Sequence, residues 1–307
     1  MYIFNLMAIN KTKKLYFLLN PFAGNGDAQI IFERVKRILG EQQIGIESYL
    51  SQSKGDIERF IKNEDLSEFD GICVIGGDGT IHEAIEGLMQ SEKSKYLSLG
   101  IIPAGSGNAF ADDLGLKDPL DALENIIIGN AIGIDVMKIK RRESINYAIN
   151  IIGWGMASNV NILAEKLRWL GSIRYSLASL FSIASIKLQD ASIILEEQVF
   201  NEKAAFFIAL NTIHTGKGMK MAPNAKLNDG LIDIILLKKA SRLRILKIFL
   251  QLFSGNHIYD PLVLYVQVKK FAINTHDDLL NIDGENIGKT PIEVSVVRNA
   301  IQLFAKI

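Results

Sequence analysis

Three glycine-rich loops, each directly after an apolar run, constrain the fold of this chain more than any other feature. The loops are Asn20-Pro21-Phe22-Ala23-Gly24 after Leu15–Leu19, Gly76-Gly77-Asp78-Gly79-Thr80 after Ile72–Ile75, and Pro103-Ala104-Gly105-Ser106-Gly107-Asn108 after Leu97–Ile102. Short apolar runs that alternate with helical patterns are typical of parallel, helix-covered sheets. Ligands of such sheets bind beyond the carboxyl ends of the strands, so we expect the loops to converge on one crevice.

The same alternation continues from Lys14 to about Ile134. A fourth strand is predicted over Ile44–Leu50, and helices are predicted over Ala28–Leu39, Asp56–Lys62, Thr80–Met89 and, from the N-cap pair Asp118-Pro119, to Ile127. We therefore expect residues 11–134 to form an α/β nucleotide-binding catalytic domain with a Rossmann-like parallel sheet.

Residues 135–307 are richer in strand patterns. Strands are predicted over Asp135–Lys140, Ala205–Leu210, Leu231–Leu237, Val263–Phe271, Ile292–Val297 and Ile301–Phe304. Apolar residues spaced three or four apart predict helices between Leu163 and Leu180, divided at Gly171, and a further helix is predicted from Ser241 to about Ser254. We expect a second, mostly antiparallel β-sandwich domain, whose last strand either stays there or returns to the first domain.

The glycine loops also indicate the chemistry. The glycines around Asp78 allow backbone N–H groups to approach a phosphate, with Asn20, Thr80 and Ser106 as further donors. No loop has the G-x-x-x-x-G-K-[ST] or G-x-G-x-x-G pattern, and the nearest match, Gly284–Thr290, is one residue short and precedes a proline. Asp78 can bind magnesium, take a proton from an attacking hydroxyl, or act only as a helix N-cap. The pattern predicts phosphoryl transfer.

Composition excludes several classes of partner. The chain has 307 residues, with 34 Lys and Arg against 34 Asp and Glu, and its one cysteine, Cys73, lies in a predicted buried strand. The balanced charge offers no footprint for nucleic acid, and a lone buried cysteine forms no internal disulfide. The start does not look like a signal peptide, and no apolar run is long enough to span a bilayer. We therefore expect a cytoplasmic protein that meets lipid only from the surface.

Together, the three loops resemble the catalytic domain of the diacylglycerol kinase and sphingosine kinase family of lipid kinases. NAD kinases and phosphofructokinases share the G-G-D-G core. The resemblance runs from about Lys14 to the C-terminus, and the combination of motifs is specific. It implies an NAD kinase/phosphofructokinase-type nucleotide fold, ATP and Mg²⁺ as cofactors, and transfer of the γ-phosphoryl group to a hydroxyl of a membrane lipid alcohol held by the β-rich domain.

The resemblance also implies the site residues. Asp78, Asp283 and Glu285 would be the catalytic acids; analogy with sphingosine kinases favours Asp78 as general base, whereas analogy with bacterial diacylglycerol kinases favours Glu285. A simple turn is the alternative for Asp283-Gly284. The residues expected to bind ATP are Asn20, Pro21, Phe22, Ala23, Gly24, Ser51, Gly76, Gly77, Asp78, Gly79, Thr80, Gly105, Ser106, Asn108, Arg168 and Arg174.

Two further segments carry implied roles. Gly153–Tyr175 is closer to sphingosine kinases than to most bacterial relatives. By that match Arg168 and Arg174 would reach the nucleotide phosphates, although composition alone indicates ordinary solvated arginines. Residues 216–231 resemble the segment in which bacterial diacylglycerol kinases carry a structural magnesium. Asp229 would be its carboxylate ligand, with the backbone carbonyls of Lys226 and Leu231 nearby, and a hairpin turn is the alternative.

The lipid that accepts the phosphoryl group is indicated by Asn159-Val160-Asn161, which stands where sphingosine kinases have Asp-Val-Asp. By that match Asn159 and Asn161 would contact the lipid. Asn161 cannot form an ion pair with a sphingoid ammonium, which favours diacylglycerol or another neutral lipid alcohol. A sphingoid-base or ceramide kinase, an NAD kinase, and a non-catalytic nucleotide- or lipid-binding regulator stay open as alternatives.

Contact with a membrane is indicated by basic residues that interleave with apolar ones from Lys238 to Phe253. The pattern is compatible with an anionic membrane surface, although packing against the β domain is the favoured explanation for this helix. The family resemblance predicts peripheral membrane association. The oligomeric state is open, with a homodimer among the alternatives.

Overall fold

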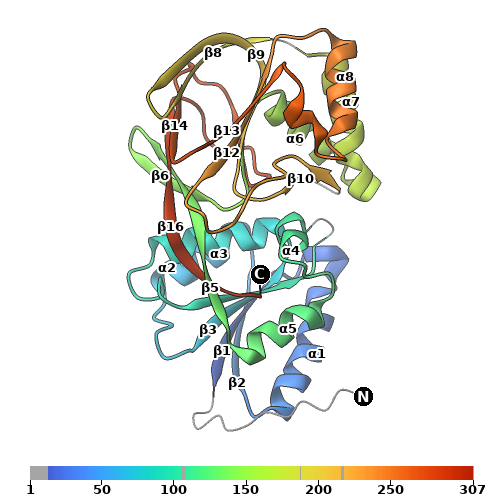
Figure 1. Ribbon diagram of the computed structural model, residues 1–307. Coiled ribbons are helices and arrows are strands. Elements are labelled where there is room, and N and C mark those ends of the chain that lie inside the picture. Colours follow the sequence, from blue (N-terminus) through green and yellow to red (C-terminus); the bar gives the residue numbers. More distant parts are fainter. Residues whose placement is uncertain (1–12, 106–107, 187, 216–217, 307) are drawn as a thin grey trace.

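The computed structural model describes residues 13–105, 108–186, 188–215 and 218–306 (Figure 1). It shows two stacked domains, an α/β domain with a mostly parallel sheet and a domain with an antiparallel β-sandwich. The predicted fold class is confirmed.

The first domain is built on parallel strands. These are β1 (Lys14–Leu19), β2 (Gly45–Leu50), β3 (Gly71–Gly76) and β4 (Ser98–Pro103), in the spatial order β4–β3–β1–β2. The accompanying helices are η1 (Ala23–Gly26), α1 (Ala28–Glu41), α2 (Asp56–Asn63), α3 (Asp78–Gln90), α4 (Ala109–Asp113) and α5 (Pro119–Ile128). Residues of β3 are buried along its whole length, as expected of a central parallel strand covered on both faces.

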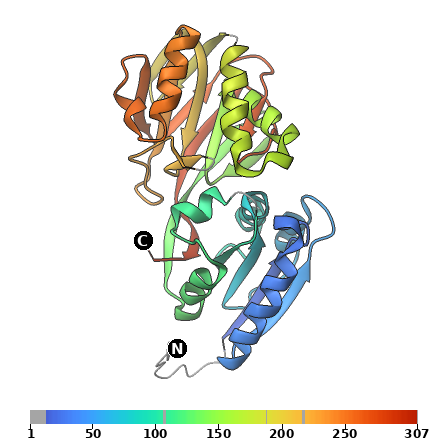
Figure 2. The same ribbon diagram turned by 90° about the vertical axis from the view of Figure 1, so that its right-hand side faces the viewer.

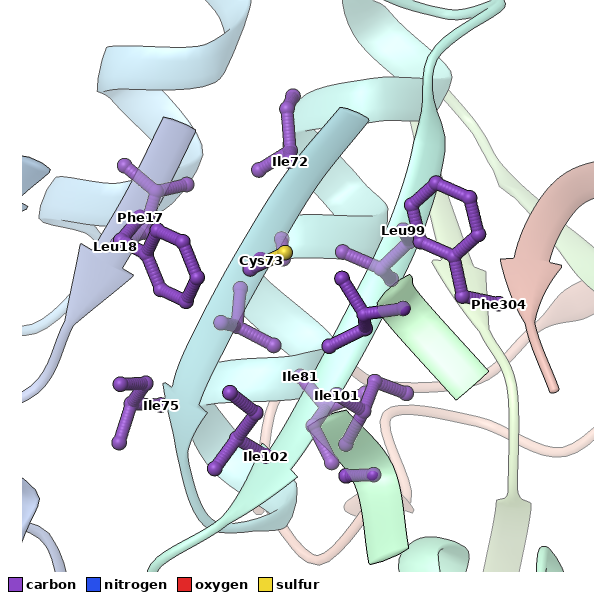
Figure 3. Packing of buried hydrophobic residues seen from close by; sticks show 14 of the residues in the cluster. Phe17, Leu18, Ile72, Cys73, Ile75, Ile81, Leu99, Ile101, Ile102 and Phe304 are labelled. Carbon is purple, nitrogen blue, oxygen red and sulfur yellow. The ribbon is translucent and has the colours of Figure 1, made fainter. Parts of the chain in front are cut away.

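The core of this domain explains the lone cysteine. Figure 3 shows Cys73 of β3 among Phe17 of β1, Leu99 of β4 and Phe304, and all but Phe304 are fully buried. Burial raises the pKa of the Cys73 thiol to about 12, so the side chain stays neutral and serves as a packing residue.

The second domain is largely antiparallel. Its strands are β6 (Ser144–Ala148), β7 (Ile151–Gly155), β8 (Gln189–Leu195), β9 (Gln198–Leu210), β10 (His214–Thr215), β11 (Met219–Lys220), β12 (Ile232–Lys238), β13 (Val263–Val268), β14 (Lys270–Ile273) and β15 (Leu280–Ile282). Its helices are α6 (Met156–Lys166), η2 (Arg168–Ile173), α7 (Arg174–Ala184), α8 (Arg242–Gln251) and η3 (Asn256–Tyr259). Trp154 and Phe207 belong to a core cluster of the strands, whereas Ile183 of α7 and Ile245 of α8 belong to a second cluster beside Phe206.

Two long strands join the domains. β5 (Ala131–Arg141) pairs antiparallel with β16 (Ile292–Phe304), and β16 also pairs with β14 in the second domain and, at Leu303, with β4 in the first. The predicted boundary between residues 134 and 135 falls inside β5 and stays a prediction. The chain therefore crosses between the domains along paired strands and not along a loose linker.

Some predicted elements have different limits in the structure. The predicted strand Val263–Phe271 is two strands with different partners, because β13 pairs with β12 whereas β14 pairs with β8 and β16. The two predicted strands at the C-terminus are one, β16, with an irregular register between Val297 and Ile301. Gly171, at a φ of +59°, interrupts the helical region as predicted. In the described residues, no helix is long and apolar enough to cross a membrane.

Candidate active site

A cleft of about 1130 Å³ lies between the carboxyl ends of the parallel strands and the second domain. One side is lined by residues 20, 22–24, 77–80, 105, 108 and 109, and the other by residues 281 and 283–285 together with parts of α6, α7, α8, β9 and β12. The described residues of the three glycine loops therefore line one crevice, and residues of the second domain line its opposite side.

Close contacts hold the glycine loops together as one wall. The Nδ2 of Asn20 donates to Oγ1 of Thr80 at 3.1 Å, which ties the first loop to the second. Gly24 has a φ of +55°, and a Cβ at this position would lie 1.9 Å from the carbonyl oxygen of Ala104, so only glycine fits against the third loop. Ser51, buried at the end of β2, also lines the cleft.

Asp78 connects the second loop to the third. Its Oδ2 accepts the backbone N–H of Ala109 at 3.1 Å and its Oδ1 that of Phe110 at 3.2 Å, so it caps α4 and not its own helix α3. Burial raises the pKa of Asp78 to about 6; the two N–H donors lower it, and the nearby Asp283 and Asp112 raise it. Each oxygen keeps a lone pair for a further ligand.

Asp283 is saturated by buried hydrogen bonds. Its Oδ1 accepts the N–H groups of Asn150 at 2.8 Å and Ile151 at 2.9 Å. Its Oδ2 accepts the N–H of Ile149 at 2.9 Å and lies 3.0 Å from Nδ1 of His82. With four partners and a side chain only 3% exposed, this carboxylate ties the start of β7 to α3.

Glu285 is held by a single ion pair across the cleft. Its Oε2 lies 2.5 Å from Nζ of Lys54, and a third of its side chain is exposed. A Cβ on Gly79 would lie 3.7 Å from Oε1 of Glu285. The carboxylate therefore extends from the second domain to the second glycine loop.

His82 is a buried residue of α3 that the sequence analysis missed as a partner of the acids. Burial by itself would lower the pKa of His82. The hydrogen bond to Asp283 and the charges of Asp283, Glu86 and Glu285 outweigh this effect, so the pKa of His82 is raised above its ordinary value. The sequence offered no signal for this contact, because His82 and Asp283 are 201 positions apart.

Two other acids that the sequence analysis passed over connect the domains. Asp113 of α4 accepts the N–H groups of Ile213 at 2.6 Å and His214 at 3.2 Å. Asp135 of β5, which is fully buried, accepts those of Gly230 at 2.6 Å and Asn299 at 2.8 Å. Lys54 was also missed, although its position in the loop after β2, at the same sheet edge as the glycine loops, was a usable signal.

The far end of the cleft is apolar. It is lined by residues that include Ile183, Phe206, Ile208, Leu237, Ile245, Ile248, Phe249 and Leu252. Asn161 of α6 lies where this end meets the polar one: its Nδ2 donates to the carbonyl of Gly284 at 2.6 Å, and its Oδ1 is buried without a hydrogen-bond partner. Asn159, in contrast, is exposed and does not line the cleft.

The other predicted ATP-binding residues are placed as follows. Phe22, Ala23, Gly77, Gly105, Asn108 and Arg174 line the cleft, whereas Pro21 and Gly76 do not. The guanidinium of Arg174 lies 4.9 Å from the ring centre of Tyr175, and its Nη2 is 3.9 Å from a carboxylate oxygen of Glu165. Ser106 and the side chain of Arg168 lie outside the part of the chain that the structure describes.

The predicted magnesium residues Lys226, Asp229 and Leu231 are not part of the cleft. Lys226 and Asp229 line a separate hollow with Asn224 and Gln267. Oδ1 of Asp229 accepts the N–H of Leu231 at 3.0 Å, a local contact that a turn also explains. The metal at this position stays a prediction.

Comparison with protein families identifies two domain types in the chain. Residues 14–139 match the diacylglycerol kinase catalytic domain, and residues 150–305 match the YegS C-terminal NAD kinase beta sandwich-like domain. A diacylglycerol kinase of Bacillus subtilis (strain 168) is 30% identical over 289 residues, covering 92% of each chain. Sphingosine kinase 1 of Arabidopsis thaliana is 25% identical over 360 residues, covering 99% of this chain and 74% of that one.

Solved structures agree with the family matches. A candidate diacylglycerol kinase from Bacillus anthracis str. Sterne has a TM-score of 0.80 at 25% identity, and the match covers 97% of this chain and 99% of that one. An NAD kinase from Archaeoglobus fulgidus, solved in complex with ATP, has a TM-score of 0.51 at 12% identity, covers 94% of this chain and 92% of that one, and shares the fold. The chain belongs to the diacylglycerol kinase family and is a lipid kinase that uses ATP.

Proposed function

We propose that this lipid kinase transfers the γ-phosphoryl group of Mg²⁺-ATP to the free hydroxyl of diacylglycerol. The observation that supports the proposal is the continuity of the cleft, whose glycine-lined end suits phosphates and whose apolar end suits acyl chains. Its volume of about 1130 Å³ lies above the range of roughly 300–1,000 Å³ usual for one small ligand. A cleft in which two substrates meet is expected to be this large.

In the proposed reaction, the lipid hydroxyl oxygen forms a bond to the γ-phosphorus while the bond from that phosphorus to the bridging oxygen breaks. The departing ADP keeps the electron pair of the broken bond. We assign Glu285 as the general base that takes the hydroxyl proton, because it faces Gly79 and is partly exposed. The two oxygens of Asp78 already accept N–H groups, which orients this carboxylate as a ligand.

The donor set at the glycine loops fits Mg²⁺. In the described part of the chain, no three His, Cys, Asp or Glu side chains gather as a cage, and a Mg²⁺-ATP site needs none, since one or two carboxylates with phosphate and water oxygens suffice. Asp78 would hold the ion there. Bound in this way, Mg²⁺ would neutralise charge on the transferring phosphoryl group.

Asn161 supports a neutral lipid as acceptor. Its Nδ2 already donates to the carbonyl oxygen of Gly284, so its buried Oδ1 remains as a hydrogen-bond acceptor at the junction of the polar and apolar ends of the cleft. A hydroxyl can donate to that oxygen, whereas a sphingoid ammonium would find no opposite charge on it. Diacylglycerol is therefore favoured over a sphingoid base, which is the second candidate because of the similarity to a sphingosine kinase.

The route to the lipid is proposed to be peripheral contact with an anionic membrane surface from the cytoplasm. Figure 2 shows α7 and α8 on one face of the molecule. Six large apolar side chains are exposed on η2, α7 and α8, and we call them the membrane face: Trp169, Ile173, Leu180, Phe181, Leu243 and Leu250. Exposed Arg242 and Lys247 of α8 add positive charge. The predicted packing of α8 also holds, because Ile245, Ile248 and Phe249 are buried.

The proposal is tested with purified protein, Mg²⁺ and labelled ATP against diacylglycerol, monoacylglycerol, ceramide and sphingosine, each in mixed micelles. We expect phosphorylated diacylglycerol as the main product. The Asp78→Asn variant should lose at least about a hundredfold in turnover, the size expected when a key electrostatic group is removed. Its urea unfolding curve shows whether the fold is intact.

Other outcomes would point to the rival functions. Phosphorylated sphingosine as the main product would replace diacylglycerol with a sphingoid base. Conversion of NAD to NADP, with no labelled lipid, would identify an NAD kinase. Binding of ATP without any phosphorylated product would indicate a regulator, and an active Asp78→Asn variant would remove Asp78 from the mechanism.

A further inference from the structure

The described lining of the cleft contains more acidic than basic side chains. The acidic side chains that line it are Asp78, Glu83, Asp112, Glu165, Asp283 and Glu285, whereas the basic ones, among the described side chains, are Lys54 and Arg174. ATP brings several negative charges into this acidic surrounding, so binding requires cations that can face its phosphates.

The two cations differ in freedom. The guanidinium of Arg174 stacks on Tyr175 beside Glu165, and its side chain is 12% exposed. The side chain of Lys54 is 69% exposed and has Glu285 as its ion-pair partner at 2.5 Å. A long, exposed lysine side chain can change partner at little cost, because an ion pair at the surface contributes little to stability.

The backbone beneath Lys54 is fixed relative to the glycine loops. Glu83 of α3 accepts the N–H of Gly55 at 2.8 Å and that of Ile57 at 3.3 Å, which ties the loop after β2 to the helix that begins at Asp78. The side chain of Lys54 therefore reaches Glu285 beside Gly79 from a rigid base.

We propose that Lys54 is the mobile phosphate-binding cation of this kinase and that it exchanges the carboxylate of Glu285 for the terminal phosphate of ATP. The inference rests on the proposed function, because it assumes that the phosphates lie at the second glycine loop. The exchange links the substrates: when the ammonium moves to the phosphate, Glu285 is released to accept the proton of the lipid hydroxyl. Lys54 itself transfers no proton and forms no covalent bond.

The proposal is tested by calorimetric binding of ADP and of a non-hydrolysable ATP analogue, both with Mg²⁺, so that turnover plays no part. Lys54→Met should weaken binding of the ATP analogue about tenfold and change ADP binding less than about twofold, because only the analogue has a terminal phosphate. Glu285→Gln should tighten binding of the analogue about two- to fivefold, since the ion pair no longer competes. Lys62→Met, on an exposed lysine of α2 outside the cleft lining, is the matched control and should change neither affinity.

The double variant Lys54→Met/Glu285→Gln decides whether the two residues compete directly. We expect the gain from Glu285→Gln to vanish when Lys54 is absent. Equal losses for ADP and the ATP analogue, or a gain from Glu285→Gln that persists without Lys54, would overturn the proposal. If the wild-type protein phosphorylates no lipid, the proposed function fails; if it does so and Lys54→Met binds both nucleotides normally, only this inference fails.

Discussion

At the residue scale, the proposed role of Asp78 as a metal ligand makes activity depend on the ionisation of its carboxyl group. The pKa of Asp78 is raised from 3.8 to about 6, mainly by burial. Only the ionised carboxylate is a good Mg²⁺ ligand, so binding of Mg²⁺-ATP must release the proton below this pH. With Asp78 as the proposed metal ligand, we therefore expect full nucleotide binding only above about pH 6.

We expect kcat/KM for ATP to rise about tenfold per pH unit below pH 6 and to level off above it, because this ratio reports ionisation in the free enzyme. The measurement is a rate profile from pH 5 to 8 at saturating lipid. Asp112→Asn, which removes a neighbouring charge that raises the pKa of Asp78, should move the acid limb to lower pH without changing its slope. An acid limb centred near pH 4 would show that Asp78 does not set it.

The raised pKa of Asp78 affects the free energy of unfolding in the direction opposite to its expected effect on activity. Because the folded protein binds the Asp78 proton more tightly than the unfolded chain, the contribution of this residue to stability is largest below about pH 4 and decreases as pH rises through about 6. Activity and the local stability contribution thus change in opposite directions over one pH interval, as is common where a site is arranged for function.

At the element scale, η2, α7 and α8 have two tasks. Inner residues of α7 and α8 belong to the second core cluster, together with residues of β9 and β12. The exposed residues that we propose as the membrane face lie on η2, α7 and α8. Trp169 belongs to the membrane face and also lines the cleft, which supports an entrance for lipid beside the surface proposed to contact the bilayer.

We expect Phe181→Asp and Leu243→Asp each to reduce sedimentation with phosphatidylglycerol vesicles at least about fivefold, because each change removes apolar contact and adds a repulsive charge. Tyr96→Asp is the matched control, since Tyr96 is an exposed apolar side chain of the first domain. Activity on a short-chain, monomeric diacylglycerol should stay near the wild-type level. Equal loss with Tyr96→Asp would argue against the membrane face as the contact surface.

Helices and strands could be predicted from the sequence where the spacing of nearby apolar residues determines them. β1, β3, α1 and α5 follow from apolar runs, helical spacing and caps, and they lie close to their predicted ranges. The division between β13 and β14 could not be predicted, because a continuous apolar run does not show that the strand changes partners. The same limit applies to Asp283, whose N–H donors are more than 130 positions away in the sequence.

At the scale of the whole molecule, β5 and β16 make the two domains one folding unit. β5 and β16 both contribute buried residues to the core of the first domain and to the strand cluster of the second domain around Trp154 and Phe207. Neither domain can therefore lose these strands and keep its core. Asp135 of β5 strengthens this connection, since its buried carboxylate accepts N–H groups from Gly230 and Asn299.

We expect a single calorimetric unfolding transition, with calorimetric and van't Hoff enthalpies that agree. Asp135→Ala should lower the free energy of unfolding by about 1–3 kcal/mol, since the buried N–H of Gly230 and the partly buried N–H of Asn299 lose their acceptor. The same change at the exposed Asp190 of β8 should have an effect below about 0.5 kcal/mol. Two separate transitions, of which only one responds to Asp135→Ala, would show that the domains unfold independently.

The excess of acidic side chains in the cleft also bears on the end of the catalytic cycle. The phosphorylated lipid of the proposed reaction carries new negative charge. Its phosphate would lie on the side of the cleft that Asp283 and Glu285 line. In the proposed reaction, six acidic side chains of the lining would repel the phosphorylated lipid after ADP and its metal have left, against the two described basic side chains, Lys54 and Arg174. We therefore expect the lining that makes cations necessary for loading to favour release of the product.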